Sequence, residues 1–124
     1  VGTPANILEN IALGVDMFDC VMPTRNARTG TLYTWGGIVN IKNKKWEEDF
    51  SALDPLGSAS VDKMYSKSYV RHLIRANELV GMYITSIHNL SFYLDLVREA
   101  RKHIIQGDFV AWKNKMVVQI SQKL

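Results

Sequence analysis

Residues 17–30 read Met-Phe-Asp-Cys-Val-Met-Pro-Thr-Arg-Asn-Ala-Arg-Thr-Gly, and this stretch decides how the rest of the chain is interpreted. The apolar run has the length of a strand, carries Asp19 in its middle and stops at a proline. Because the apolar residues of 15–22 do not alternate with polar ones, they predict a strand covered on both faces, as in a parallel sheet wrapped by helices. We expect a loop holding Arg25 and Arg28 to follow. A carboxylate near a strand end, followed by two guanidinium groups, suits chemistry on a phosphate-bearing substrate.

The composition predicts a single soluble domain. Of the 124 residues, 47% are hydrophobic and 22% are charged, which is typical of one globular unit with one core. No apolar run approaches the roughly 20 residues that cross a bilayer, so we expect no membrane partner and a cytoplasmic location. Cys20 is the only cysteine, which excludes an internal disulfide and a thiolate cluster. Because the chain begins at Val1 rather than at a methionine, we expect a fragment of a longer protein.

Positive charge is concentrated in one part of the chain. The formal net charge is +3, and the stretch between Cys20 and Trp46 contains cations but no acid. These cations are Arg25, Arg28, Lys42, Lys44 and Lys45. Such clustering is typical of a surface that binds a polyanion such as RNA, and the alternative is a solvated loop and hairpin that are simply basic.

The elements before residue 57 are predicted by local signals. Thr3 before a proline is a helix start, and Gly14 is the expected end of that helix. Residues 31–41 predict a β-hairpin with Gly-Gly at 36–37 as its turn. We expect 43–56 to be a connector in which Trp46 and Phe50 both contact apolar residues.

The remainder predicts helices. We expect one from about 61 to 80, stopped by Gly81, and a second from about 82 to 106, closed by Gly107. A third helix is expected to be capped by Asp108. The residues predicted to face the core from the second helix are Ile84, Ile87, Leu90 or Ser91, Leu94, and Val97 or Arg98; from the third, Trp112, Met116, Val117, Ile120 and Leu124.

Three segments carry a resemblance to a known family. Phe-Asp-Cys-Val-Met-Pro-Thr-Arg at 18–25 resembles the nucleophile motif of the bacterial tRNA-guanine transglycosylases, or queuine tRNA-ribosyltransferases, in a Bacteroidetes-like form. Arg-His-Leu-Ile at 71–74 and Ile-His-Asn-Leu at 87–90 agree with it.

The resemblance implies an α/β parent protein with a (β/α)8 TIM barrel. This chain would be its C-terminal part: 1–30 the last barrel helix and strand, 31–56 a β-hairpin and connector, and 57–124 a mainly helical subdomain. Barrel enzymes keep their active sites at the end of the strands where Asp19 is expected.

The resemblance also implies a role for Asp19. In the family, the matching aspartate attacks the ribose of the wobble guanosine in a G-U-N anticodon, and a 7-deazaguanine base then replaces guanine. On the residues alone, the alternative is that Asp19 is a cap or the partner of a nearby arginine, and periodicity does not decide between these roles. The general base and the base-recognition pocket are expected outside this chain, so the fragment alone should be inactive.

The arginines and lysines are assigned to the tRNA partner. The resemblance implies that Arg25 and Arg28 contact the nucleotides flanking the target guanine, while Lys42, Lys44 and Lys45 add weaker phosphate contacts. The alternative for the two arginines is solvation or pairing with carboxylates.

The resemblance implies a structural zinc site at four positions, and at three of them this chain lacks the expected cysteine. Where most relatives carry three cysteines and a histidine, the chain has Gly57, Ala59, Asp62 and His88. We therefore predict no zinc and no other cofactor, with His88 hydrogen-bonded between helices, since one histidine and one carboxylate cannot make a closed tetrahedral site. Cys20 is predicted to be a small packing residue on the side of the strand opposite Asp19. The residues expected to compensate for zinc by packing are Leu56, Val61, Ile87 and Leu90.

A last set of residues is assigned to a homodimer. Tyr65, Tyr69 and His72 recur at i, i+4 and i+7, which is consistent with a core stripe; the resemblance implies instead a dimer interface, with Glu78 in an interface salt bridge. Two alternatives to the enzyme remain: a non-catalytic tRNA-binding subunit on the same fold, and a dimerisation module without activity.

Overall fold

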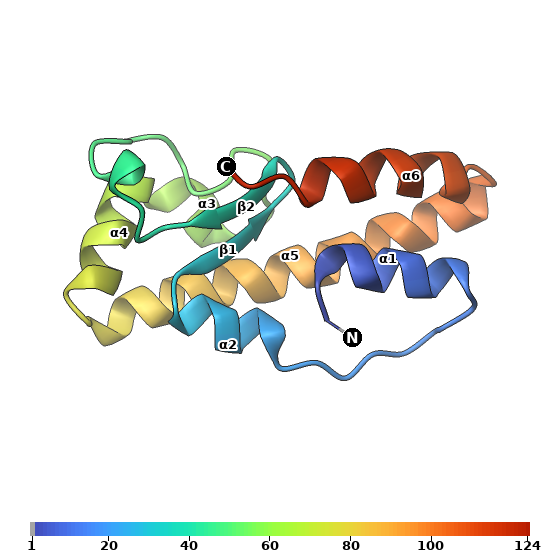
Figure 1. Ribbon diagram of the computed structural model, residues 1–124, viewed down its shortest axis with the longest axis horizontal. Coiled ribbons are helices and arrows are strands. Elements are labelled where there is room, and N and C mark those ends of the chain that lie inside the picture. The colour runs from blue at the N-terminus through green and yellow to red at the C-terminus, as the bar shows by residue number, and fades with distance from the viewer. Residues whose placement is uncertain (1) are drawn as a thin grey trace.

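The computed structural model describes residues 2–124, which form helices around a single hairpin (Figure 1). The elements are α1 (Pro4–Ala12), α2 (Met22–Arg28), β1 (Thr31–Thr34), β2 (Gly37–Asn40), η1 (Lys44–Trp46), α3 (Ser60–Met64), α4 (Lys67–Arg75), α5 (Leu79–Gln106) and α6 (Phe109–Ile120). Helix α5 runs along most of the long axis of the molecule, and α1, α2, α3, α4, α6 and β1 all pack against it. No helix in the described part of the chain is long and apolar enough to cross a membrane.

The first helix and the hairpin are confirmed. The Thr3 hydroxyl caps α1 by accepting a hydrogen bond of 3.2 Å from the Asn6 amide, and Gly14 follows with a φ of +95°. β1 and β2 pair antiparallel, with Thr34 opposite Gly37. The two-residue turn is therefore 35–36, one position before the predicted glycine pair. Gly37 has a φ of +144°, and a Cβ there would lie 2.4 Å from the Gln122 carbonyl oxygen.

The strand predicted over 15–22 is wrong for this chain. Residues 15–20 are extended but pair with no strand, and Met17 is 88% exposed. Figure 1 shows them as a long connector along one edge of the molecule. A parallel strand needs neighbouring strands, and residues 2–124 supply only the hairpin. Pro23 lies in the first turn of α2, where its missing N–H costs nothing, so Arg25 and Arg28 lie on a helix and not in a loop.

The connector before the helices is partly as predicted. Trp46, at the end of η1, is buried in the core, but Phe50 is 78% exposed. The prediction that both contact apolar residues is therefore correct only for Trp46.

The helix predicted over 61–80 is two helices. Tyr65 adopts an extended conformation between α3 and α4, and the Ser66 hydroxyl caps α4 by accepting a hydrogen bond of 3.1 Å from the Tyr69 amide. α4 is followed by Asn77, with a φ of +56°, rather than stopped at Gly81. Gly81 lies inside α5, where a Cβ would approach Leu73 Cβ to 2.9 Å. It therefore permits close packing of two helices.

The buried face of α5 differs from the prediction. Of the apolar positions expected to face the core, only Ile84 is fully buried, while Ile87, Leu90 and Leu94 are about half exposed. The buried stripe instead includes the polar residues Thr85, His88 and Asn89, followed by Phe92, Tyr93, Leu96 and Ala100. These polar side chains have buried hydrogen-bond partners, which offset the free-energy cost of removing polar groups from water. A prediction that buries only apolar residues therefore misses this face.

The last helix is confirmed in its start and in most of its predicted face, but it ends at Ile120, before Leu124. Gly107 ends α5 with a φ of +81°, and Asp108 begins α6, although its carboxylate accepts from His103 Nδ1 at 2.8 Å instead of capping the helix. Trp112, Met116, Val117 and Ile120 pack into the core as predicted. Leu124 lies beyond α6, and its amide donates to the Ile38 carbonyl at 2.9 Å.

Two hydrophobic clusters stabilise the chain on either side of the polar residues of α5. The first joins the hairpin to α3 and α4: Leu32, Val39, Ile41, Trp46, Leu53, Val61, Val70, Leu73, Ile74 and Ile84. The second joins α1, α5 and α6: Ile7, Leu8, Tyr33, Phe92, Tyr93, Leu96, Ala100 and Ile120. Thr85, His88 and Asn89 therefore lie at the junction of the two clusters.

Candidate functional site

Asp19 is an exposed carboxylate in the extended segment before α2. Side chains of an extended segment alternate between two sides. Phe18 and Cys20 are half buried, and both line a cavity of about 720 Å³ together with residues of α1 and α5. Asp19 is exposed and does not line this cavity. Cys20 thus lines the cavity and Asp19 does not, which is consistent with the predicted placement of the two side chains on opposite sides, although Cys20 is only partly buried.

Helix α2 presents its arginines outward. Arg25 and Arg28 are three residues apart and therefore neighbours on one face, and both are exposed. Pro23 and Ala27, on the other side, are buried. The prediction that Arg25 and Arg28 act on the same partner is consistent with this arrangement, in which helical backbone carries both side chains.

The lysines divide into two groups. Lys42 follows β2, and its side chain lies beside Gly30, just after α2. Lys44 and Lys45 lie in η1, where Lys45 Nζ is 4.9 Å from the centre of the Trp46 ring. All three are exposed, so Lys42 extends the basic surface of α2 and the other two lie further along the connector.

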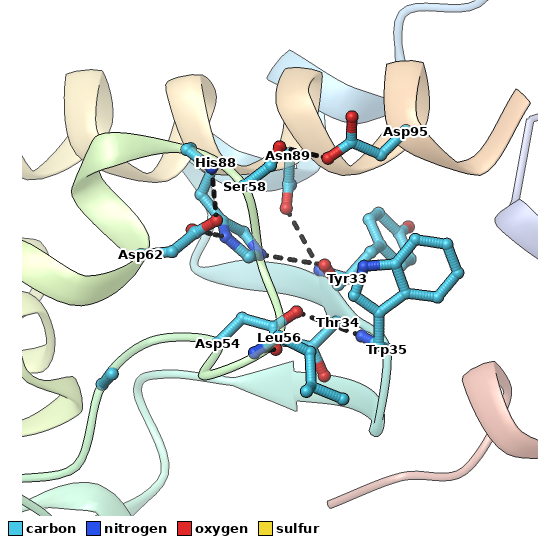
Figure 2. Close-up of polar contacts among 12 residues, drawn as sticks. Tyr33, Thr34, Trp35, Asp54, Leu56, Ser58, Asp62, His88, Asn89 and Asp95 are labelled. Carbon is cyan, nitrogen blue, oxygen red and sulfur yellow. Dashed lines mark hydrogen bonds and ion pairs between the residues drawn. The ribbon is translucent and has the colours of Figure 1, made fainter. Parts of the chain in front are cut away.

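His88 and Asp62 form a buried pair at the position where the family resemblance implies zinc. His88 Nδ1 is hydrogen-bonded to the Asp62 carboxylate, and His88 Nε2 lies 2.9 Å from the Tyr33 carbonyl oxygen (Figure 2). The other carboxylate oxygen accepts from the Ala59 amide at 3.0 Å. His88 therefore joins α5 to α3 and also to the hairpin.

Gly57 provides the space for this pair. A Cβ at Gly57 would lie 2.0 Å from Asp62 Oδ2. The glycine and the aspartate therefore depend on each other, since a side chain at 57 and a carboxylate at 62 exclude one another in this arrangement.

The four positions do not fit a structural zinc site. Gly57 and Ala59 have no ligating side chain, and the Asp62 carboxylate and the His88 imidazole are hydrogen-bonded to each other. Residues 2–124 contain no group of three or more His, Cys, Asp or Glu side chains placed to hold a metal ion. Of the residues expected to compensate by packing, Val61 is buried, but Leu56, Ile87 and Leu90 are exposed, so that expectation is wrong for three of four.

Two buried side chains of α5 hold α2 and were missed from the sequence. Asn89 Nδ2 donates to the carbonyl oxygens of Pro23 and Thr31, both at 2.9 Å. Thr85 Oγ1 donates to the Ala27 carbonyl at 3.0 Å. A signal was present, because 85, 88 and 89 are polar positions on one face of a helix whose other face is apolar.

The residues assigned to a dimer interface gather on one surface, with one exception. The rings of Tyr65 and Tyr69 stack with centroids 5.7 Å apart, although Tyr65 precedes α4 rather than lying in the same helix. Tyr69 and His72 line a hollow that also includes Phe50, which is among the most exposed large apolar side chains. Glu78 is exposed at the start of α5 and does not line this hollow.

Comparison with known proteins identifies the family. The family model described as Queuine tRNA-ribosyltransferase matches residues 1–122, and the chain belongs to this family. The resemblance found from the motifs is thereby confirmed.

Individual relatives support the same assignment. The queuine tRNA-ribosyltransferase of Aquifex aeolicus is 50% identical over 124 residues, which is 100% of this chain and 33% of the relative. That of Nitratidesulfovibrio vulgaris is 53% identical over 113 residues, covering 91% of this chain and 30% of the relative. That of Helicobacter pylori is 46% identical over 123 residues, covering 99% and 33%. The chain thus spans about a third of the length of the curated relatives it matches.

Proposed function

We propose that the protein containing this chain is a tRNA-guanine transglycosylase, a pentosyltransferase that exchanges guanine at the wobble position of G-U-N anticodons for a 7-deazaguanine in queuosine modification. Family membership and the names of the relatives support this proposal. The observation that carries it is local: Asp19 is an exposed carboxylate immediately before a helix with two exposed arginines and an anchored inner face.

In the proposed reaction Asp19 is the nucleophile. Its carboxylate oxygen bonds to ribose C1′ while the C1′–N9 bond breaks, and the bonding electron pair leaves with guanine, which is protonated by a group outside this chain. The incoming base then displaces Asp19 and releases a proton. A carboxylate nucleophile suits this chemistry because it divides one difficult glycosyl transfer into two easier displacements.

Arg25 and Arg28 are proposed to hold the anticodon loop. The target nucleotide must leave its stack to meet Asp19, which leaves its neighbours to be fixed by the protein. A guanidinium suits this task because it both pairs with phosphate and hydrogen-bonds or stacks on a base. Lys42 extends this surface, and Lys44 and Lys45 are proposed as weaker phosphate contacts.

The fold of the intact protein is proposed to be a (β/α)8 barrel with the appended helical subdomain. α1 would be its last helix, and 15–22 would become its last strand when neighbouring strands are present. The exposed apolar residues support this. Leu13 at the end of α1, Met17 and Val21 in the segment before α2, and Leu94 of α5 leave an apolar surface uncovered. We infer that the remainder of the barrel covers it.

A homodimer is proposed through Tyr65, Tyr69 and His72, with Glu78 as a peripheral ion pair. The exposed Tyr69, stacked on the partly buried Tyr65, and the nearby exposed Phe50 support this, since amphipathic aromatics are favoured at interfaces. Sedimentation of the full-length protein at several concentrations tests it: Tyr69→Ala should weaken the dimer, and an unchanged dimer would contradict this interface. The proposed tRNA substrate implies that the protein acts in the cytoplasm.

The exchange of labelled guanine into a G-U-N tRNA tests the proposed function. The full-length protein should catalyse it, and Asp19→Ala should reduce the rate by at least about 1000-fold, because the nucleophile is lost. If the unaltered protein binds the tRNA without exchange, it is a non-catalytic binding subunit and the proposal fails. If Asp19→Ala keeps the rate, another residue is the nucleophile.

A further inference from the structure

Asn89 makes an unusually complete set of contacts for a buried amide. The side chain is fully buried at the junction of the two hydrophobic clusters. Its Oδ1 accepts from the Tyr33 amide at 3.1 Å, and its Nδ2 donates to the carbonyl oxygens of Pro23 and Thr31, both at 2.9 Å (Figure 2 shows the contact with Tyr33). One side chain of α5 therefore bonds to the backbone of α2 and to two residues of β1.

Helix α2 depends on such contacts. It has only seven residues, and an isolated helix of this length is not stable in water. The segment before it is extended and largely exposed. Besides Asn89, its polar tethers to other elements are the bond from Thr85 to the Ala27 carbonyl and the bond of 2.6 Å from Asn26 Nδ2 to the Tyr33 hydroxyl.

Tyr33 connects these tethers to the buried pair. Its carbonyl is bonded to His88, its amide to Asn89 and its hydroxyl to Asn26. His88 thus fixes the hairpin to α5, while Asn89 fixes both the hairpin and α2. The orientation of α2 is set by α5 through these side chains.

We propose that Asn89 is a positioning residue for tRNA recognition, which sets the orientation of α2 so that Arg25 and Arg28 reach the anticodon loop beside Asp19. This inference rests on the proposed transglycosylase function. It assigns to Asn89 no contact with RNA or base, because the residue is buried behind α2. Only a carboxamide of this size accepts from one amide and donates to two carbonyls at once; aspartate lacks the donors and leucine lacks both.

Steady-state exchange kinetics of the full-length protein test this role. Asn89→Ala should raise KM for tRNA about 10-fold or more, because a small misplacement of a substrate-positioning group is costly, and should leave KM for guanine unchanged. A merely structural role would lower kcat in proportion to the lost active enzyme and leave KM for tRNA unchanged, and that result would overturn the proposal. Asn114→Ala, at an exposed position of α6, is the matched control and should change neither constant.

A mutant cycle tests whether Asn89 affects tRNA binding through Arg25 and Arg28. In an Arg25→Ala/Arg28→Ala background, Asn89→Ala should produce no further rise in KM for tRNA, whereas an independent, multiplicative rise would overturn the proposal. If Asn89→Ala does not fold, Thr85→Val removes the hydrogen bond to the Ala27 carbonyl with little change in shape. This variant should also raise KM for tRNA and leave KM for guanine unchanged, with a smaller rise than Asn89→Ala. Absence of exchange by the unaltered protein would overturn the proposed function itself, while exchange with an unchanged KM for tRNA in these variants overturns only the positioning role.

Discussion

The segment 15–21 and the buried polar residues of α5, Thr85, His88 and Asn89, differ in burial and in hydrogen bonding. The first carries the proposed nucleophile on an extended, mostly exposed backbone without strand partners, whereas the second carries no proposed chemistry and is fully buried and hydrogen-bonded. The two are joined through α2, which follows directly from the segment and is held by Thr85 and Asn89. The difference shows that the buried polar residues fix α2, while the segment that carries the proposed nucleophile has no such contacts among residues 2–124 and, under the proposed function, depends on the remainder of the protein.

The largest effect on stability is expected at the buried pair. Asp62→Ala leaves a buried imidazole nitrogen of His88 and the Ala59 amide without their partner, and because each such group costs about 1–3 kcal/mol, the free energy of unfolding should fall by about 2–6 kcal/mol. Denaturant unfolding of the full-length protein measures this. A loss below about 1 kcal/mol would show that the pair does not stabilise the junction.

The Asp62 position also tests the prediction that this chain lacks the structural zinc that the family resemblance implies. Metal analysis of the purified protein should find no stoichiometric zinc. The combined variant Gly57→Cys, Ala59→Cys and Asp62→Cys, which restores three thiolates beside His88, should bind one zinc ion per chain. Stoichiometric zinc in the unaltered protein would contradict the prediction.

The next effect concerns the exposed face of α2. Arg25→Ala together with Arg28→Ala should weaken tRNA binding by about 2–4 kcal/mol and reduce the dependence of log affinity on log salt by about two. Filter binding over a salt series measures both quantities. Lys115→Ala, at an exposed cation of α6, should leave the affinity almost unchanged. Equal losses in the two variants would mean that charge alone, rather than the geometry of α2, governs binding.

The sequence predicted the elements that depend on local chemistry. The helix start at Thr3, the two strands of the hairpin and the helix end at Gly107 were placed correctly, because caps and left-handed glycines act over a few residues. The hairpin turn lies one residue earlier than predicted, and Asp108 begins α6 without capping it through its carboxylate. Asp19 and the two arginines were likewise proposed from a contiguous motif.

The features that failed depend on distant parts of the chain. The predicted strand over 15–22 has no neighbours to pair with in residues 2–124. The apolar face of α5 at Ile87 and Leu94 is exposed, because the polar face is buried by partners from α2, α3 and β1 that no local pattern reveals. The hydrogen bonds of Asn89 were missed for the same reason, since the carbonyl oxygens that accept from it are 58 and 66 positions away.

A smaller effect is expected at Gly57. Gly57→Ala places a methyl group into the Asp62 carboxylate and should cost about 1–3 kcal/mol, as overpacking does. Ala59→Gly, on the same loop, alters no contact of the Asp62 side chain and serves as the control. The double variant Gly57→Ala/Asp62→Ala should show less than the sum of the two single losses, and additive losses would contradict the coupling of these positions.

The smallest effect on stability is expected at Asp49, in the connector 43–56. The side-chain and backbone hydrogen bonds from Ser51 lower the pKa of Asp49 below its ordinary value of 3.8. A lowered pKa in the folded state stabilises it above the unfolded pKa, and that contribution is lost as pH falls below about 4. Asp49→Asn should therefore cost less than about 1 kcal/mol at pH 7, because the group is largely solvated, and the difference should shrink towards about pH 3. A difference that grows as the pH falls would contradict this assignment.

The most direct test of the central claim is to map the covalent enzyme–RNA adduct. The full-length protein is incubated with a G-U-N tRNA in the absence of an incoming base, the adduct is trapped by denaturation, and the modified peptide is identified by mass spectrometry. The expected result is a ribose ester on Asp19, within the peptide that precedes α2. An adduct on any other side chain, or exchange without an adduct, would contradict it.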